Sequence, residues 1–246
     1  MKKRTTAIAA VLSVLVCGSP LLTGCSSFRG NTAFQNALEK QNESYARAIL
    51  DYTKYTKAIE IDPNNANAYV NRGIANRNLD NYSEAISDFS KAMEIDPKYV
   101  DAYVNRGIAK RTLGDSDGAI SDFNKVINID PNNANAYVNR GLAKYYLGDN
   151  ARAISDYNKG IEINPRNAPA YYNRGIIKVD LGDYSGAISD YSKAIKINPK
   201  YADAYVYRGV VKQYIGNGKM KGACSDWRKA ASLGDENAAQ MVINEC

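Results

Sequence analysis

Residues 68–97 read AYVNRGIANRNLDNYSEAISDFSKAMEIDP, and close copies of this stretch begin at residues 102, 136 and 170. Each copy starts 34 residues after the previous one, without an insertion. Five prolines keep the same spacing: Pro63, Pro97, Pro131, Pro165 and Pro199. Self-similarity at a fixed period of this length is the signature of a solenoid, in which each unit is one supersecondary structure stacked on the next.

Each copy predicts two helices joined by a tight turn. Small and apolar residues recur at helical spacing in both halves, and a Leu-Gly-Asp sequence separates the halves. The glycine suits the left-handed position after a helix, and the aspartate suits the cap of the next helix. Asp80-Asn81 takes the place of Gly-Asp in the first copy. The second helix is expected to end before the proline, which disfavours helical conformation in the residue preceding it.

The order of aromatic, Gly, Ala, aromatic, Ala and Pro in these copies resembles the tetratricopeptide repeat (TPR) family. The resemblance implies an all-α fold, a right-handed superhelical solenoid of antiparallel helix pairs. Residues 66–201 form four regular repeats, and 33–65 are expected to form a degenerate N-terminal repeat or capping hairpin. Residues 202–246 are expected to form a divergent last repeat, two residues longer, and a closing helix. Terminal repeats differ because one side faces solvent.

The N-terminus predicts export. Lys2, Lys3 and Arg4 precede a short apolar run, which is typical of a signal peptide over residues 1–24. The following cysteine, in Leu-Thr-Gly-Cys25, resembles a bacterial lipobox, which implies cleavage before Cys25, its acylation (palmitate) and a tether over 25–32. The implied location is the extracytoplasmic face of the cell envelope, with inner and outer membrane both open. The alternative is an ordinary signal peptide cleaved nearby, with Cys25 incidental.

The composition disfavours several classes of function. Removing residues 1–24 lowers the formal net charge from +6 to +3, which is too small for a nucleic-acid-binding protein. The chain contains no histidine, which removes the usual general base and the commonest metal ligand. We therefore expect no enzymatic activity, no cofactor, no metal and no nucleic-acid partner.

Two cysteines remain near the C-terminus. Cys224 and Cys246 lie on opposite sides of a predicted turn at Gly234, so two antiparallel helices would bring them together. A disulfide is the leading hypothesis, since an exported chain reaches a compartment where disulfides persist. A buried thiol beside a frayed terminus is the alternative.

An arginine precedes the glycine of each unit, where the TPR family prefers leucine, and an aspartate recurs in each second helix. The predicted pairs are Arg72–Asp88, Arg106–Asp122, Arg140–Asp156, Arg174–Asp190 and Arg208–Asp226. Each arginine is expected to lie level with its own aspartate and with that of the preceding repeat, which predicts a partly buried ladder. The alternative is that the arginines extend into solvent.

The resemblance places partner binding on the concave face, which first helices line. An asparagine recurs there at residues 71, 105, 139 and 173, and Tyr207 replaces it in the last unit. An amide both donates and accepts, so Asn71, Asn105, Asn139 and Asn173 are candidates to bind the backbone of an extended peptide. The alternative is that they bond to a neighbouring helix. Changing positions on the same stripe are candidates for specificity: Arg77, Arg111, Tyr145, Tyr146, Tyr172, Asp180, Gln213 and Tyr214.

Two functions follow from these features. The leading hypothesis is a membrane-anchored, non-enzymatic adaptor that binds a partner peptide or protein in its concave groove. The alternative is a structural scaffold subunit of a cell-envelope assembly, with its contacts on the convex or edge surfaces. The lysine and arginine pattern of the co-chaperone carboxylate clamp is missing, because valine, isoleucine and leucine occupy most of those positions. Binding of chaperone tails is therefore not expected.

Overall fold

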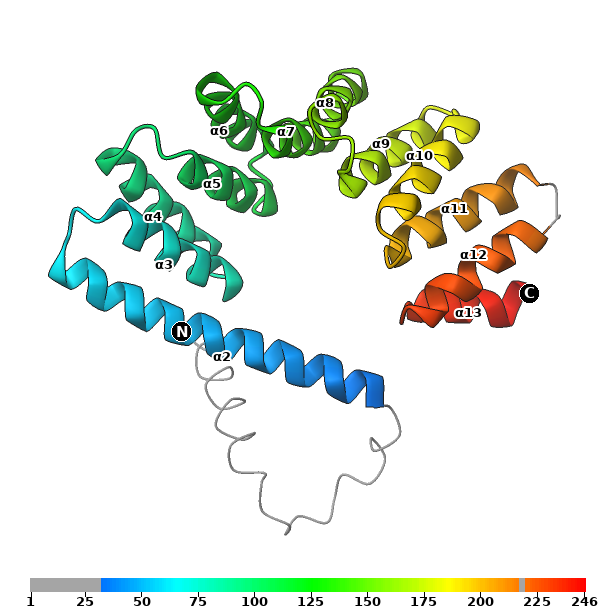
Figure 1. Cartoon of the computed structure of the whole chain (residues 1–246), viewed down its shortest axis with the longest axis horizontal. Helices are drawn as coiled ribbons and strands as arrows, with labels where there is room; N and C mark the ends of the chain where they lie inside the picture. Colours follow the sequence, from blue (N-terminus) through cyan, green and yellow to red (C-terminus); the bar gives the residue numbers. More distant parts are fainter. Residues whose placement is uncertain (1–31, 217–219) are drawn as a thin grey trace, which may run out of the picture.

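The computed structural model of the 246-residue chain describes residues 32–216 and 220–246, without the side chains of 32–38, Lys40 and Lys221. These residues form helices joined by short turns, with no strand among them (Figure 1). The predicted signal peptide and Cys25 lie outside the described residues. No described helix is both long and apolar enough to cross a bilayer.

Five helix pairs follow one another along the chain. The first helices of the pairs are α3 (Ala66–Asn78), α5 (Val100–Thr112), α7 (Ala134–Tyr146), α9 (Ala168–Asp180) and α11 (Ala202–Ile215). The second helices are α4 (Tyr82–Ile95), α6 (Ser116–Ile129), α8 (Asn150–Ile163), α10 (Tyr184–Ile197) and α12 (Lys221–Ser232). One helix precedes the pairs, α2 (Thr32–Ile61), and one follows them, α13 (Glu236–Glu245).

The turns within the pairs use the predicted capping residues. Gly114 has φ +88°, and Asp115 accepts a hydrogen bond from the backbone N–H of Gly118, so the two residues close one helix and open the next. The first pair agrees with the expectation for Asp80 but not for the cap at Asn81. Asp80 itself takes the left-handed conformation, with φ 59°, and Asn81 makes no side-chain capping bond. Asp80 therefore does the work of the glycine, and its carboxylate accepts from Tyr45 of α2 instead of capping α4.

The N-terminal segment is one helix, so the capping hairpin expected over residues 33–65 is wrong. Residues 32–61 contain no glycine or proline, and nothing in them stops the helix. The later part of α2 packs on α3 and buries Ala48 and Ile59. The earlier part runs past α3 (Figure 1), and of its described side chains Glu39 and those of residues 41–44 are exposed. This segment therefore caps the solenoid with a single helix.

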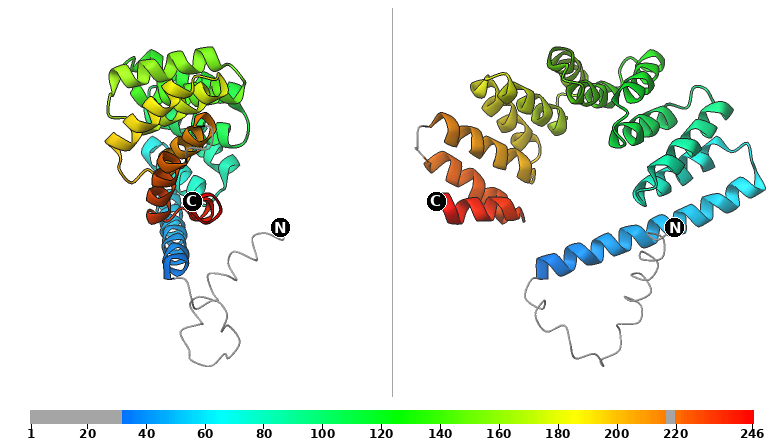
Figure 2. Two further views of the ribbon diagram at one scale, coloured as in Figure 1. Left: turned by 90° about the vertical axis from the view of Figure 1, so that its right-hand side faces the viewer. Right: turned by 180° about the vertical axis from the view of Figure 1, so that it is seen from behind.

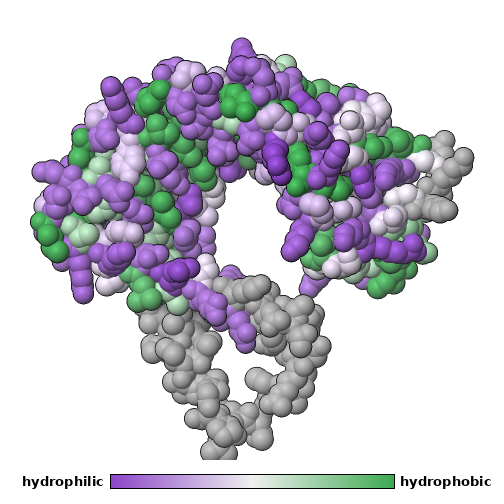
Figure 3. Space-filling view, viewed as in Figure 1, coloured by the Kyte–Doolittle hydropathy of each residue, from purple (hydrophilic) through white to green (hydrophobic). Residues whose placement is uncertain are grey.

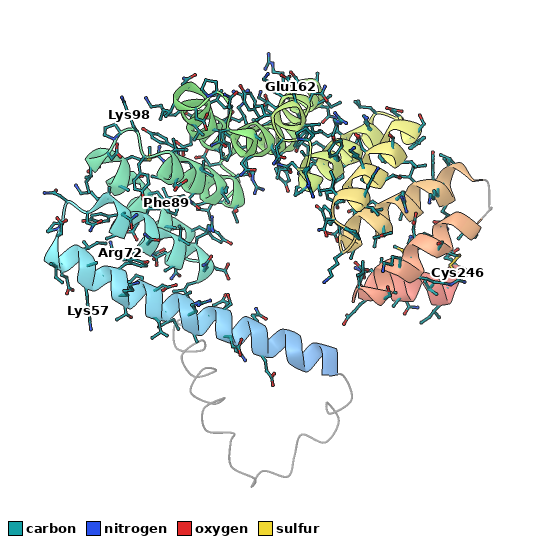
Figure 4. All side chains as sticks on the ribbon, in the orientation of Figure 1. Lys57, Arg72, Phe89, Lys98, Glu162 and Cys246 are labelled. Atoms are coloured by element: carbon teal, nitrogen blue, oxygen red, sulfur yellow. A yellow bond between two sulfur atoms is a disulfide. The ribbon has the colours of Figure 1, made fainter. Side chains whose placement is uncertain are left out.

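The core of each pair consists of an aromatic ring lying on a glycine. Phe89 is fully buried and points between α3 and α4 (Figure 4). A Cβ atom added to Gly73 would lie 2.6 Å from Phe89 Cε1, so this position has no room for a side chain. The equivalent pairs are Gly107–Phe123, Gly141–Tyr157, Gly175–Tyr191 and Gly209–Trp227. The small residue lets the two helices approach closely.

The predicted arginine–aspartate pairs form within each repeat. Arg106 donates from Nε to Asp122 Oδ2 (2.9 Å) and from Nη2 to Oδ1 (2.6 Å). The same pairs recur at Arg72–Asp88, Arg140–Asp156, Arg174–Asp190 and Arg208–Asp226. The hydrogen bond to Asp88 raises the pKa of Arg72. The last pair is 18 residues apart instead of 16, which agrees with the two extra residues of the last repeat.

The contact with the preceding repeat differs from the prediction. Arg106 Nη1 donates to Ser90 Oγ (2.9 Å), and not to the preceding aspartate, Asp88. Residues two apart point to nearly opposite sides of a helix, so Asp88 faces its own first helix while Ser90 faces the next one. The equivalent partners of the later arginines are Asn124, Asn158 and Ser192. Arg106, Arg140, Arg174 and Arg208 therefore each join three helices.

A second cation completes most of these sites. Lys110 Nζ lies 3.0 Å from Asp122 Oδ2, and the side chain of Asp122 is 3% exposed. The equivalent lysines are Lys144, Lys178 and Lys212. In the first repeat the buried amide of Asn76 donates to Asp88 instead (3.0 Å). Most of the buried carboxylates are therefore balanced by two cations, and Asp88 by one cation and an amide.

The pairs stack into an arc with the first helices on its inner side (Figure 1), and the same curvature is seen from behind (Figure 2). First helices of neighbouring repeats touch, α3 with α5, α5 with α7 and α7 with α9. Lys98 and Glu162 point to the outside of the arc (Figure 4). The inner side is an open hollow in the space-filling view (Figure 3). We call the surface of the first helices that lines this hollow the groove.

Candidate interaction groove

The recurring asparagines lie on the groove, and three of the four bond to their own helices, whereas Asn173 is half-buried and makes no side-chain hydrogen bond within the described part of the chain. Asn105 Nδ2 donates to the backbone oxygen of Asp101 (2.8 Å), one turn earlier in α5. Asn71 and Asn139 make the same bond to Asn67 and Asn135. Such a bond uses one N–H of each amide. In the described part of the chain the Oδ1 atom of Asn139 has no hydrogen-bond partner. These bonds stay within one helix, and the alternative of a bond to a neighbouring helix is met at Asn105, whose Oδ1 accepts from Arg77 of α3. Asn71, Asn105 and Asn139 each retain groups for a ligand.

Three of the changing positions, Arg77, Tyr145 and Asp180, make hydrogen bonds across repeats. Arg77 Nη1 donates to Asn105 Oδ1 (2.6 Å), which links α3 to α5. Tyr145 donates its hydroxyl to Asp180 Oδ2 (2.9 Å), which links α7 to α9. Burial and this hydrogen bond raise the pKa of Tyr145. These side chains are therefore held in place before any partner binds.

A cluster of tyrosines occupies the groove between α9 and α11. The ring of Tyr172 lies 5.0 Å from that of Tyr201, 5.7 Å from that of Tyr207 and 5.9 Å from that of Tyr191, between ring centroids. Burial raises the pKa of Tyr172 and raises the pKa of Tyr201 to about 12. Tyr191 is fully buried, and its hydroxyl has no partner among the described residues. The cluster offers flat apolar faces.

Arg111 and Tyr214 lie at the ends of their helices. The guanidinium of Arg111 stands over the ring of Tyr146, 5.8 Å from its centroid, and its Nε is buried without a partner in the described part of the structure. Arg111 and Tyr146 line a pocket of about 550 Å³ beside the α5–α6 turn. Tyr214 is 68% exposed and lies against Tyr184, whose ring centroid is 4.9 Å away. Tyr146 and Tyr214 therefore expose the most ring surface of the predicted residues.

A second pocket, of about 610 Å³, lies at the C-terminal end of the groove and was not predicted from the sequence. It lies between α11 and α13. Its lining residues are Asp203, Val206, Tyr207, Val210, Asp235, Asn237, Gln240, Met241 and Asn244. The one available signal was Tyr207, which breaks the asparagine row. Tyr207 lines a pocket only because α13 folds back beside α11, and the pattern of the repeats does not predict that position of α13.

A disulfide fixes α13. Cys224 of α12 and Cys246 are bonded, with Cα atoms 5.7 Å apart, which agrees with the predicted pair (Figure 4). Asp235 caps α13 by accepting from the backbone N–H of Ala238 (2.7 Å). The closing helix is thus held at both ends. Among the described residues, no group of His, Cys, Asp or Glu is arranged to hold a metal ion.

The stacked helix pairs and their hollow inner face define a helical-repeat solenoid of the class that binds other proteins. Models described as TPR repeat match residues 109–148, 141–179 and 175–216, and one described as tetratricopeptide repeat matches residues 66–99. Together they cover more than half of the 246 residues, so the chain belongs to the tetratricopeptide repeat family. Members of this family are protein-interaction scaffolds, in general without enzymatic activity.

Solved structures share the fold. The crystal structure of MamA is 27% identical and superimposes with a TM-score of 0.57, covering 68% of this chain and 96% of MamA. YrrB, described as a TPR protein with an unusual peptide-binding site, is 23% identical with a TM-score of 0.55, over 77% of this chain and 97% of YrrB. PilF from Pseudomonas aeruginosa is 19% identical with a TM-score of 0.65, over 72% and 79%. No curated protein matches the sequence significantly.

Proposed function

We propose that the mature chain is a lipid-anchored adaptor that holds an extended peptide or protein segment in its groove. The observation that carries the proposal is the row of half-buried asparagines on the groove, of which Asn71, Asn105 and Asn139 are oriented by bonds to their own helices. An amide that is already oriented loses little conformational freedom when it binds, which favours affinity. The exposed faces of Tyr146 and Tyr214 add contact area for partner side chains.

Membrane attachment rests on the sequence. The lipobox-like Leu-Thr-Gly-Cys25 supports acylation of Cys25, which lies outside the described residues. The test replaces Cys25 by Ser and follows the chain by fractionation and by incorporation of a labelled fatty acid. We expect the label to be lost and the chain to leave the membrane fraction. A serine variant that keeps its label would overturn the anchor and leave the groove proposal standing.

The groove is tested with photo-crosslinking residues in cells. One crosslinker replaces Tyr146, which is 63% exposed at the groove, and its matched control replaces Glu162 on the outside of the arc. We expect a crosslinked partner, identified by mass spectrometry, from the first position only. The double change of Asn105 and Asn139 to Ala should weaken that crosslink without altering the circular dichroism spectrum. Unaltered crosslinking in the double variant would rule out the asparagine row.

The same experiment tests the scaffold function. The scaffold function is a second candidate because the capping helix α2 has exposed apolar side chains, with Leu50 70% and Ile61 85% exposed. A crosslinked partner at Glu162 but none at Tyr146 would indicate an envelope assembly that uses the convex surface.

A further inference from the structure

The pocket between α11 and α13 differs in chemistry from the rest of the groove. Its floor is apolar and incompletely covered, since Tyr207 is 44% and Val210 is 38% exposed. Val206 and Met241 extend this surface. A contiguous apolar surface inside a concave site gains free energy when a ligand covers it. The floor is therefore suited to an aliphatic chain.

The rim of the pocket is acidic. Asp203 lies in the first turn of α11 and Asp235 caps α13. The carboxylate of Asp203 has no hydrogen-bond or ion-pair partner among the described residues, and the Oδ2 atom of Asp235 is not used by the cap. None of the nine described residues that line the pocket is a lysine or arginine. The pocket thus presents two carboxylates and no compensating cation.

Both walls are held in place. Cys246 ties the end of α13 to Cys224, and Trp227 of α12 donates Nε1–H to the backbone oxygen of Val206 (3.3 Å) on the α11 side. Preformed sites lose less entropy on binding than mobile ones. The closing helix therefore acts as one wall of a binding site as well as a cap on the solenoid.

We propose that this pocket receives a lysine or arginine side chain of the segment bound in the groove. The aliphatic stem would lie on Val206, Val210 and Tyr207, and the cationic head would reach Asp203 and Asp235. Long basic side chains combine an apolar stem with a charged end in this way. Hydrogen bonds between a cation and a carboxylate are among the stronger polar contacts. The inference rests on the proposed groove function and adds the chemistry of one subsite.

The test uses a displayed library of random peptides selected against the full mature chain. We expect enriched peptides to share a lysine or arginine at one position. The double variant Asp203→Asn with Asp235→Asn should bind these peptides at least about tenfold more weakly, since charge-assisted hydrogen bonds are lost. Asparagine is isosteric and retains the helix cap, so the fold is preserved. The matched control is Glu236→Gln, an exposed carboxylate beside Asp235 but outside the pocket.

A second variant makes the same test by another route. Val210→Lys places a cation in the pocket at a half-exposed position, and it should abolish the preference for basic residues. Enriched peptides without a basic residue, or a preference unchanged in both variants, would overturn the inference and leave groove binding intact. No enrichment by the unaltered chain would overturn the proposed function, and the inference with it.

Discussion

Replacing Asp122 by Ala tests the electrostatic framework of the solenoid. The carboxylate is 3% exposed and holds Arg106 and Lys110, so its removal leaves two cations facing each other without an anion. Breaking a buried ion pair by removing one partner costs about 3–5 kcal/mol. Arg106 and Lys110 are 20% and 19% exposed and regain part of their hydration. We therefore expect a loss of about 2–4 kcal/mol in the free energy of unfolding.

The first repeat provides a graded comparison. Asp88 holds one cation, Arg72, and the neutral amide of Asn76. Asp88→Ala leaves no like-charge pair, so it should cost about 1 kcal/mol less than Asp122→Ala. This order follows from the lysine that the first repeat lacks and not from burial, since both aspartates are buried.

The assay is urea denaturation of the mature chain followed by far-ultraviolet circular dichroism. For a chain of this size the expected loss in free energy of unfolding corresponds to a fall of about 5–12 °C in the Tm of a thermal melt. The stability of a solenoid is close to a sum of repeat and interface terms, so amide hydrogen exchange should accelerate first in α5 and α6. Ser121→Ala, at the exposed neighbouring position of α6, is the control and should change stability by less than about 0.5 kcal/mol. The reasoning is refuted if Asp122→Ala equals this control, or if Asp88→Ala costs more.

Three further predictions use other contacts. Cys246→Ser should lower the free energy of unfolding by about 3 kcal/mol under oxidising conditions only, and reductant should raise the intact mass of the unaltered chain by two hydrogens. Gly73→Ala should destabilise by about 1–3 kcal/mol through the clash with Phe89, whereas Gly222→Ala, where the nearest atom would be 3.5 Å away, should not destabilise. The contribution of Tyr201 to the free energy of unfolding should be fully present below pH 10 and should be lost as the pH rises toward 12. Burial raises the pKa of Tyr201 to about 12 in the folded chain, whereas unfolded phenols ionise near 10. A phenolate absorbance that rises fully at pH 10 without unfolding would contradict this last prediction.

Features confined to one repeat unit were predictable from the sequence. The turn at Gly114-Asp115, the packing of Phe123 on Gly107 and the pair of Arg106 with its own aspartate each depend on residues of one 34-residue unit. Four nearly identical copies show which of these residues are needed in every unit. The closing helix and the disulfide were also predictable, since a short connection at Gly234 forces two neighbouring helices to run antiparallel.

Features that depend on geometry between units, or on the end of the solenoid, were missed. The partner of Arg106 in the preceding repeat is Ser90, because a helix turns by about 200° over two residues and so directs Asp88 elsewhere. The N-terminal segment keeps the sequence pattern of the end of a repeat, but lacks the glycine that would break α2 into a hairpin.

The changing residues of the groove are coupled, and this affects how specificity can be altered. Tyr145 and Asp180 are 35 residues apart, so their bond joins different positions of two repeats, and comparison of aligned positions does not reveal it. If Tyr145 is replaced by Phe, Asp180 loses its donor and becomes an unpaired carboxylate beside the tyrosine cluster. A partner with a basic group at this point would then bind more tightly, and one with an acidic group more weakly. A change at one groove position therefore alters the electrostatics of the next repeat, and the two positions have to be varied together.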